Sequence, residues 1–347
     1  MSAIRIVHMG LGPIGQAVAR QVAQCRAFKI VGAIDVDPAK AGRDVGLVIG
    51  LARRLGITVQ ENAAGTLRSA KPDIVVHCTS SSLARVMPEL EAILAAKSAI
   101  VSTTEELVYP YHAHRRQATT LDRLARRARV AVLGTGVNPG FAMDVLPVLL
   151  SAVCERVDRV VVNRVQDARF RRLAFQQKIG AGLTVEQFQA RVAQGSVRHV
   201  GMAQSIAMIA DAMGWPIDRI TDEVRPKVAY ADVASEFLRV ESGQVAGIVQ
   251  DGVGYVRGDP LITLHLEAYL GAPEPCDSAE IEGSPRLSLN LRGGIPGDIA
   301  TASMVVNAIP RVLGAAPGLH TMRDLPLPGF VPRVGSSPRL ARRKRTS

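Results

Sequence analysis

The segment GLGPIG, residues 10–15, follows directly after the apolar run IRIVHM of residues 4–9. Its glycines have the spacing GxGxxG, and the next residues, QAVARQVAQC, repeat apolar positions at helical spacing. A strand, a glycine loop and a helix in this order are typical of a dinucleotide-binding fold, in which the backbone approaches a pyrophosphate at the start of the helix. We therefore expect the following residues to bind the cofactor: Gly10, Gly12, Pro13, Ile14 and Gly15.

The second predicted strand, KIVGAI, ends in Asp35, at about the distance of 20 residues at which dinucleotide-binding folds place an acid. A carboxylate there accepts hydrogen bonds from the adenosine ribose hydroxyls and repels a 2′-phosphate, so Asp35 favours NAD. Lys40 and Arg43 follow closely and can pair with a 2′-phosphate, which leaves NADP open. Alternatively, Asp35 is an ordinary turn residue of the sequence DVDP.

Apolar strands and helices continue to alternate up to about residue 154. The runs DIVVHCTS, SAIVSTT and VAVLGTG predict buried strands, and SLARVMPELEAILAAK predicts the helix between the first two. Continuous β-branched strands separated by helices indicate a parallel sheet covered on both faces. Because ligands bind beyond the carboxyl ends of such strands, we expect four hydroxyl side chains near the nicotinamide: Thr79, Ser80, Ser81 and Thr103.

The pattern changes near Arg156, where VDRVVVNRVQDA begins a series of strands that lie close together in the sequence. Strands separated by turn residues suggest a mixed or antiparallel sheet, hence a second domain of α+β class. A helical region from LTVEQFQARVAQG to SIAMIADAMGW is inserted among them, and GDIATASMVVNAIPRVL predicts a last helix. The predicted organisation is a Rossmann domain (1–154) followed by an α+β substrate domain (155–295). A segment that packs back on the first domain (296–332) and a disordered basic tail (333–347) complete the chain.

Two adjacent carboxylates, Glu105 and Glu106, directly follow the strand SAIVSTT. Removing a hydride from a carbon that bears an amine leaves an iminium ion, whose hydrolysis requires a water molecule to lose a proton. A carboxylate stabilises the iminium charge and accepts that proton, so both glutamates are candidate catalytic residues, with Glu105 nearer the strand end. The alternative is a helix start with Thr104 as N-cap and two acids in the first turn. One glutamate can cap a helix while the other reacts.

The net charge of +11 is concentrated in a few places. Residues 333–347 contain five arginines, one lysine and no acid, and the arginines of residues 115–129 have the spacing of a solvated helix face. A basic tail without a reading element binds nucleic acid only non-specifically, so no specific nucleic-acid partner is expected. The four cysteines lack metal-ligand spacing, and no apolar run reaches the roughly 20 residues of a membrane helix. With no secretory signal either, we expect a cytoplasmic protein without a metal or a membrane partner.

Six segments spread over the chain to about residue 332 point to a known family: GLGPIG, AIDVDPAKAGRDVG, STTEELVYP, GVNPGFAMDVLP, RVQDARFRRLAFQQKIGAGLT and VVNAIPRVLGAAPGLHTMRDLP. They resemble the 2,4-diaminopentanoate dehydrogenases and the related native amine dehydrogenases, whose N-terminal domain is of the dihydrodipicolinate reductase type. The resemblance implies NAD(P)-dependent oxidative deamination of an amine and the reverse reductive amination of a carbonyl compound with ammonia. It also implies a catalytic glutamate in the EEL segment and a homodimer built through the second domain.

The sequence departs from dihydrodipicolinate reductase itself, whose His-His pair, lysine and Ser-Gly-Thr stretch have no counterpart here. VVNRVQDARFRRLAFQQK stands at the corresponding strand, which argues against that reaction. The residues expected to line the substrate pocket are Thr104, Asn138, Phe141, Asn163, Gln166, Arg169, Phe170 and His199. Arg169, Arg171 and Arg172 would suit the carboxylate of a diamino acid, or they are solvated surface. The phenylalanines would suit a simple alkylamine, or they are core.

Two other functions fit the same scaffold. An oxidoreductase that acts on an alcohol or a cyclic imine would need a Lys or His acid near the carbonyl oxygen, for which Lys178 and His199 are the candidates. A non-catalytic NAD(P)-binding protein would bind the cofactor without oxidising any amine or alcohol, because a fold does not by itself fix a function.

Overall fold

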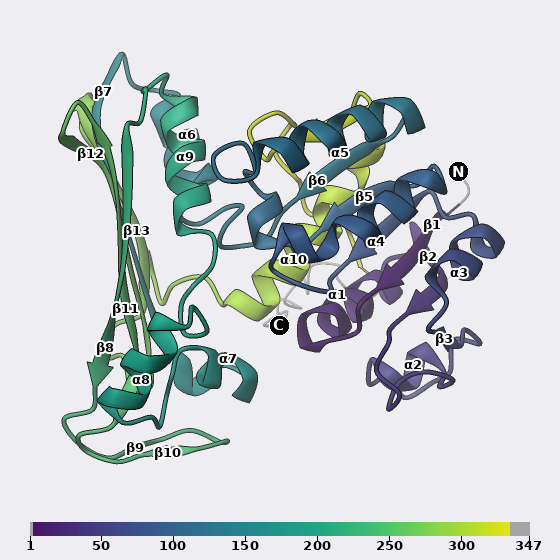
Figure 1. The fold of residues 1–347 in the computed structure, drawn as a ribbon, viewed down its shortest axis with the longest axis horizontal. Helices are drawn as coiled ribbons and strands as arrows, with labels where there is room; N and C mark the ends of the chain where they lie inside the picture. Colours follow the sequence, from purple (N-terminus) through teal and green to yellow (C-terminus); the bar gives the residue numbers. More distant parts are fainter. Residues whose placement is uncertain (1–2, 334–347) are drawn as a thin grey trace, which may run out of the picture.

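The computed structural model describes residues 3–333, which form two domains, each built around its own β-sheet (Figure 1). The first sheet has seven parallel strands in the order β15-β6-β5-β4-β1-β2-β3. Their bounds are Ile4–Met9 (β1), Phe28–Ile34 (β2), Val59–Gln60 (β3), Ile74–His77 (β4), Ala99–Ser102 (β5), Ala131–Gly134 (β6) and Gly318–His320 (β15). The strand order runs outward in opposite directions from β1 and from β4. In sheets of this kind, ligands bind in the crevice at the carboxyl ends of the two strands where the order reverses.

Both faces of the first sheet are buried, because successive residues of a strand point to opposite sides. Ile6 and Val101 belong to a core that includes α1 and α10, whereas Val7 and Ile100 belong to the opposite core with α3, α4 and α5. The helices of this domain are Pro13–Ala23 (α1), Val45–Val48 (α2), Ala63–Ala70 (α3), Leu83–Ala95 (α4), Arg115–Ala128 (α5) and Gly297–Leu313 (α10), whereas Val145–Ser151 (α6) packs on the sheet of the second domain. The predicted α/β class with a parallel sheet covered on both faces is confirmed.

The second sheet has six strands in the order β14-β13-β7-β12-β11-β8. β7 and β12 are parallel and the other neighbours are antiparallel, which confirms the predicted mixed sheet. Figure 1 shows this sheet edge-on at the left, with helices only on the side that faces the first domain. The bounds are Arg156–Asp167 (β7), Arg219–Val228 (β8), Val245–Val256 (β11), Asp259–Tyr269 (β12), Cys276–Ser284 (β13), Leu287–Arg292 (β14), Leu173–Lys178 (α7), Val185–Ala193 (α8) and Met202–Ala212 (α9).

After the second domain the chain returns to the first. α10 packs on α1, and β15 pairs with β6 at the edge of the first sheet. A small hairpin, Val233–Ala234 (β9) with Arg239–Val240 (β10), projects from the second domain. The predicted basic tail, residues 333–347, lies outside the described residues apart from Arg333.

Local structure differs from the sequence prediction at three places. The segment FAMDVLPVLLSAV predicts a helix from residue 141, but α6 begins only at Val145, because the Asp144 carboxylate accepts the Val145 N–H (2.6 Å) and the Gly140 N–H (2.8 Å) and so fixes the start of the helix. At Thr104, where a helix start was the alternative interpretation, the structure has a single 3₁₀ turn, Glu105–Leu107, without a side-chain cap. The short helix α7 was not predicted at all.

None of the helices in residues 3–333 is long and apolar enough to cross a membrane. In the same residues no group of three or more His, Cys, Asp or Glu side chains is placed to hold a metal ion. All four cysteines are free.

Candidate active site

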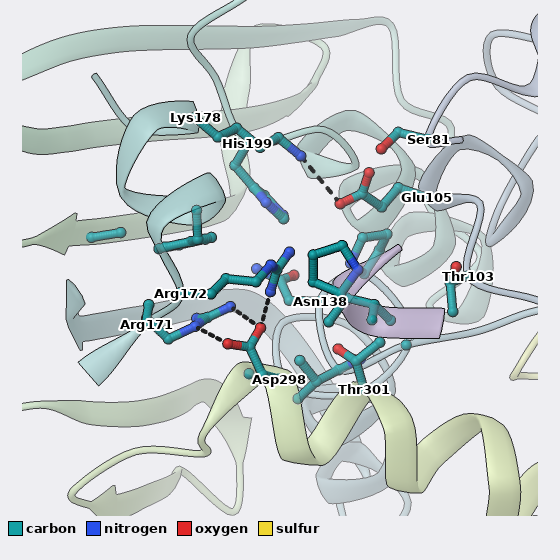
Figure 2. A pocket seen from close by; sticks show the side chains of 18 of the residues that line it. Ser81, Thr103, Glu105, Asn138, Arg171, Arg172, Lys178, His199, Asp298 and Thr301 are labelled. Carbon is teal, nitrogen blue, oxygen red and sulfur yellow. Dashed lines mark hydrogen bonds and ion pairs between the residues drawn. The ribbon is translucent and has the colours of Figure 1, made fainter. Parts of the chain in front are cut away.

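A cavity of about 300 Å³ lies between the two domains (Figure 2). One wall comes from the glycine loop, the loops after β4, β5 and β6, and the first turn of α10; the other comes from β7, α7, β11, β12 and the loop before α9. The residues predicted from sequence that line it are Gly12, Pro13, Ile14, Gly15, Thr79, Ser80, Ser81, Thr103, Glu105, Asn138, Gln166 and His199.

The glycine loop has no room for a side chain at two of its glycines. Gly10 has a φ of +88°, and a Cβ there would lie 2.5 Å from the carbonyl oxygen of Cys78. A Cβ at Gly15 would lie 2.0 Å from the carbonyl oxygen of Gly10, so neither position has room for a side chain. α1 begins directly after Gly12 with no side-chain cap, which leaves N–H groups of its first turn free. The loop therefore fits the pyrophosphate of a dinucleotide.

Asp35 follows β2 and is bound to the glycine loop, outside the lining of the cavity. Its Oδ2 accepts the Leu11 N–H at 2.5 Å and its Oδ1 accepts the Asp37 N–H at 2.9 Å. Lys40 Nζ lies 3.5 Å from Asp35 Oδ2 and 2.8 Å from an Asp37 oxygen. The carboxylate is thus held at the position where the adenosine ribose of a dinucleotide reaches, with one lysine beside it.

The segments after β4 and β5 are fixed from behind by a buried hydrogen-bond chain. The Thr104 hydroxyl donates to the Ser80 carbonyl at 2.8 Å and accepts from the Ser102 hydroxyl at 3.0 Å. The Ser102 hydroxyl also contacts His77 Nδ1 at 2.9 Å. His77, Ser102 and Thr104 are completely buried, so Thr104 lies behind the cavity wall on which Thr103 is exposed to a ligand.

The two adjacent glutamates have different surroundings. Glu106 Oε2 accepts the N–H of Leu83, the first residue of α4, at 2.7 Å, and lies 3.2 Å from His114 Nε2, so Glu106 caps α4. Glu105 lines the cavity, with Oε1 3.6 Å from Lys178 Nζ. Its Oε2 is buried without a hydrogen-bond partner among the described residues. Of the two carboxylates, Glu105 is therefore the one available to a ligand.

Cationic side chains dominate the wall formed by the second domain. Arg164 is buried against Asp277 (Nη1 to Oδ1, 2.5 Å), and Arg198 forms an ion pair with Asp222. These two charges are compensated by acids that do not line the cavity.

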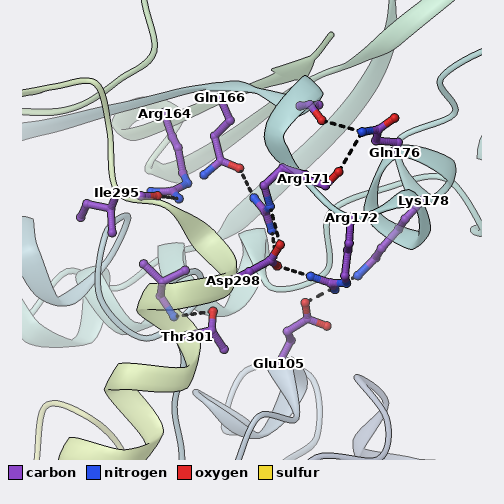
Figure 3. Close-up of polar contacts among 12 residues, drawn as sticks. Glu105, Arg164, Gln166, Arg171, Arg172, Gln176, Lys178, Ile295, Asp298 and Thr301 are labelled. Carbon is purple, nitrogen blue, oxygen red and sulfur yellow. Dashed lines mark hydrogen bonds and ion pairs between the residues drawn. The ribbon is translucent and has the colours of Figure 1, made fainter. Parts of the chain in front are cut away.

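Arg171 and Arg172 share Asp298, in the first turn of α10 (Figure 3). Arg171 donates to both Asp298 oxygens (3.0 and 3.2 Å) and to Gln166 Oε1 (2.7 Å), and its guanidinium stacks 3.9 Å from the centre of the Phe175 ring. Arg172 contacts Asp298, but its Nε is buried without a partner among residues 3–333. Arg172 is thus the guanidinium with donors left for an anionic ligand group.

His199 lines the cavity with a neutral ring. Burial, reinforced by the neighbouring cations Lys178, Arg164, Arg198 and Arg171, lowers the pKa of His199 to about 3. Its Nε2 is buried and has no hydrogen-bond partner in the described part of the chain. At ordinary pH the imidazole can form a hydrogen bond with a ligand, but it is not present as an imidazolium acid.

Comparison with known proteins agrees with the geometry. Residues 141–334 match the model of the 2,4-diaminopentanoate dehydrogenase C-terminal domain, and residues 4–131 match that of the dihydrodipicolinate reductase N-terminus. The chain belongs to the 2,4-diaminopentanoate dehydrogenase family. It is 32% identical to a 2,4-diaminopentanoate dehydrogenase from Acetoanaerobium sticklandii, over 94% of this chain and 95% of that protein. The resemblance read from the sequence is confirmed.

Two further relatives are amine dehydrogenases. The protein from Streptomyces virginiae is 25% identical, over 96% of this chain and 99% of its own. The solved structure of the Mycobacterium smegmatis amine dehydrogenase superposes with a TM-score of 0.85 at 27% identity, covering 96% of this chain and 98% of that one. The family likeness therefore extends over both domains.

Several residues predicted for the substrate pocket of this family member lie outside the cavity. Asn163 lies on the opposite face of β7 from Arg164 and Gln166, because side chains alternate along a strand, and its amide donates to Ser278 Oγ at 3.2 Å.

Three more of these residues lie near the site without lining it. Arg169 pairs with Asp167 at 2.6 Å, and Phe170 is 84% exposed. Phe141 packs against the core of the first domain. The RFRR segment turns at this point, so only its last two arginines reach the cavity, a distinction that composition does not make.

Asp298 and Thr301 line the cavity but were not among the predicted residues. The sequence showed only an acid in the first turn of a late helix. The return of the chain to the first domain brings that turn opposite Arg171, 127 residues away in sequence, and no local pattern reports such a pairing.

Proposed function

We propose that the protein is an NAD(P)-dependent amine dehydrogenase, which oxidatively deaminates an amine to a ketone or aldehyde plus ammonia and catalyses the reverse reductive amination. The observation that carries the proposal is Glu105, a carboxylate with one unpartnered oxygen in a cavity bordered by the glycine loop. The activities named for the relatives support it.

The chemistry of amine oxidation suits this carboxylate. The nicotinamide supplies the hydride acceptor when it is bound. Glu105 takes a proton from the substrate ammonium, which frees the nitrogen lone pair, and passes this proton to solvent; the regenerated carboxylate then stabilises the iminium ion that hydride removal leaves. The same oxygen accepts a proton from the water that attacks the iminium carbon. Each of these roles needs a carboxylate at the cavity, and Glu106 does not line the cavity but caps α4.

The decisive experiment is oxidation of NADH and NADPH by the purified protein with a panel of aldehydes and ketones, each with and without ammonium at alkaline pH. Oxidation that depends on ammonium is the expected result, together with NAD+ or NADP+ reduction by 2,4-diaminopentanoate. Oxidation without ammonium would instead support an alcohol dehydrogenase or an imine reductase, and no oxidation of any kind would support a non-catalytic binding protein.

The proposed substrate carries a carboxylate. Arg172 has spare donors, and the cations of the second-domain wall outnumber the acids that line the cavity. The matched probes are 4-oxopentanoate and pentan-2-one, in which a methyl group replaces the carboxylate. We expect a lower KM for 4-oxopentanoate, and Arg172→Met should raise that KM while changing the value for pentan-2-one little. Equal KM values for the two ketones would assign the pocket to simple alkylamines.

The proposed cofactor is NAD in preference to NADP, because Asp35 faces the ribose position, and the proposed location is the cytoplasm, where free cysteines stay reduced. The proposed assembly is a homodimer through the open face of the second sheet. Val161 and Val165 lie on that face, opposite the buried Val160 and Val162. Light scattering after size exclusion should give twice the chain mass, and Val165→Arg should give one chain mass. A monomeric wild-type protein would exclude this assembly.

A further inference from the structure

Reductive amination needs an acid as well as a base. When ammonia adds to a carbonyl carbon, the oxygen must gain a proton while the nitrogen loses one, and a second proton must reach the hydroxyl before it leaves as water. Glu105 can accept the proton from nitrogen, but a carboxylate that starts ionised cannot also supply the first proton to oxygen. The site must contain a second group that exchanges protons.

Most polar groups of the cavity are unsuited to this task. Arginine side chains do not give up a proton in proteins, which removes four of the five cations of the cavity wall. The low pKa of His199 keeps its ring neutral, and burial raises the pKa of the Cys78 thiol to about 12. Asp298 is occupied by two arginines. Within residues 3–333, Lys178 is the lining side chain whose cationic form can both donate and recover a proton.

The contacts of Lys178 set it apart from the arginines. Its Nζ lies 3.6 Å from Glu105 Oε1, whereas each arginine of the wall pairs with an acid other than Glu105. Lys178 is the last residue of α7 and comes from the second domain, while Glu105 comes from the first (Figure 2). The ammonium and the carboxylate therefore face the same space from opposite walls of the cavity. Because they approach from different sides, each can contact a different atom of one bound carbonyl compound.

We propose that Lys178 is a second catalytic residue, the acid that protonates the carbonyl oxygen while Glu105 acts as the base toward the nitrogen. The inference rests on the proposed amine dehydrogenase function. Ammonia forms the C–N bond, Lys178 gives one proton to the oxygen, and Glu105 takes one proton from the nitrogen. Glu105 then returns its proton to the hydroxyl, which leaves as water as the C=N bond forms. Solvent reprotonates Lys178, so carbonyl, ammonia and one proton yield iminium and water.

The test isolates these proton transfers from the hydride step. The protein is saturated with NAD+, which has no hydride to give, and incubated with 4-oxopentanoate labelled with 18O at the ketone, with and without ammonium. Reversible iminium formation releases the label to water, and mass spectrometry follows its loss above a protein-free control. We expect ammonium-dependent loss with the wild type and with the surface control Lys29→Met, and a rate at least about 100-fold lower with Lys178→Met.

Lys178→Arg separates proton transfer from charge alone. It keeps a cation beside Glu105 but cannot release a proton, so its label loss should be as slow as that of Lys178→Met. Label loss restored by Lys178→Arg, or unimpaired in Lys178→Met, would overturn the proposal. NADH fluorescence titration and thermal melting verify that both variants fold and bind cofactor, and Lys178→Gln replaces Lys178→Met if the latter does not fold. A wild-type protein without ammonium-dependent label loss and without ammonium-dependent NADH oxidation would instead refute the amine dehydrogenase function.

Discussion

Replacing each of the two adjacent glutamates by its amide separates a chemical role from a structural one. Glu105→Gln keeps the shape of the side chain but removes the carboxylate that lines the cavity and whose Oε2 has no hydrogen-bond partner among the described residues. Loss of a general base lowers turnover by about 10² to 10⁴-fold, equivalent to about 2.7–5.4 kcal/mol of activation free energy. Glu106→Gln keeps an oxygen that can accept the Leu83 N–H, so we expect turnover within about twofold of the wild type.

The assay is the initial rate of NADH oxidation with ammonium and the best carbonyl substrate, with NADH affinity measured separately by fluorescence titration. Both amide variants should bind NADH as the wild type does. Glu106→Ala, which removes the cap of α4, should cost about 1 kcal/mol of the free energy of unfolding and lower Tm by about 1–3 °C, with turnover largely retained. Full activity of Glu105→Gln, or equal loss in Glu105→Gln and Glu106→Gln, would refute the assignment of roles.

Three other predictions follow from the contacts of single side chains. Asp35→Ser removes the negative charge that would repel the 2′-phosphate of NADPH, so kcat/KM for NADPH divided by kcat/KM for NADH should rise by about tenfold or more. An unchanged ratio would show that Lys40 already neutralises Asp35. Arg164→Met leaves Asp277 buried and uncompensated at 3% side-chain exposure, which should cost about 3–5 kcal/mol in urea unfolding, and a loss below about 1 kcal/mol would mean that water reaches the pair. The pKa of His199 is about 3 in the folded protein and about 6.5 in the unfolded chain, so the unfolded chain binds more protons between these two pH values. The free energy of unfolding should therefore decline as the pH falls from 6.5 toward 3. His199→Gln should flatten that decline, and an unaltered slope would contradict the buried neutral ring.

The sequence predicted best the features that depend on local periodicity. The strand, glycine loop and helix around Gly12 require a short, fixed series of residue types, and continuous apolar strands can be stable only in a sheet covered on both faces. The hydroxyl side chains after β4 and β5 could be predicted at the crevice because neighbouring parallel strands end at the same edge of the sheet. These inferences needed no knowledge of contacts distant in sequence.

The site residues that sequence reasoning missed depend on register and on distant pairings. Asn163 and Gln166 were both expected in the pocket, but an odd separation on one strand puts them on opposite faces. The cap that Glu106 provides to α4 joins residues 23 apart, and no rule of helix capping links an acid to a helix that precedes it by that distance. The sequence favoured Glu105 only by its position nearer the strand end, and the tertiary contacts are what assign a separate role to each glutamate.

The arrangement of α7 explains why the site needs both domains. This helix of the second domain contacts the first domain near both ends: Arg171 and Arg172, just before it, bind Asp298 on α10, and Lys178 at its last residue approaches Glu105 (Figure 3). The arginine pairs fix the helix against the first domain, so the position of the Lys178 ammonium depends on contacts at the other end of the helix. A substrate carboxylate bound at the spare donors of Arg172 would share this guanidinium with Asp298. A carboxylate at Arg172 would therefore act on the placement of Lys178 through one short helix, α7.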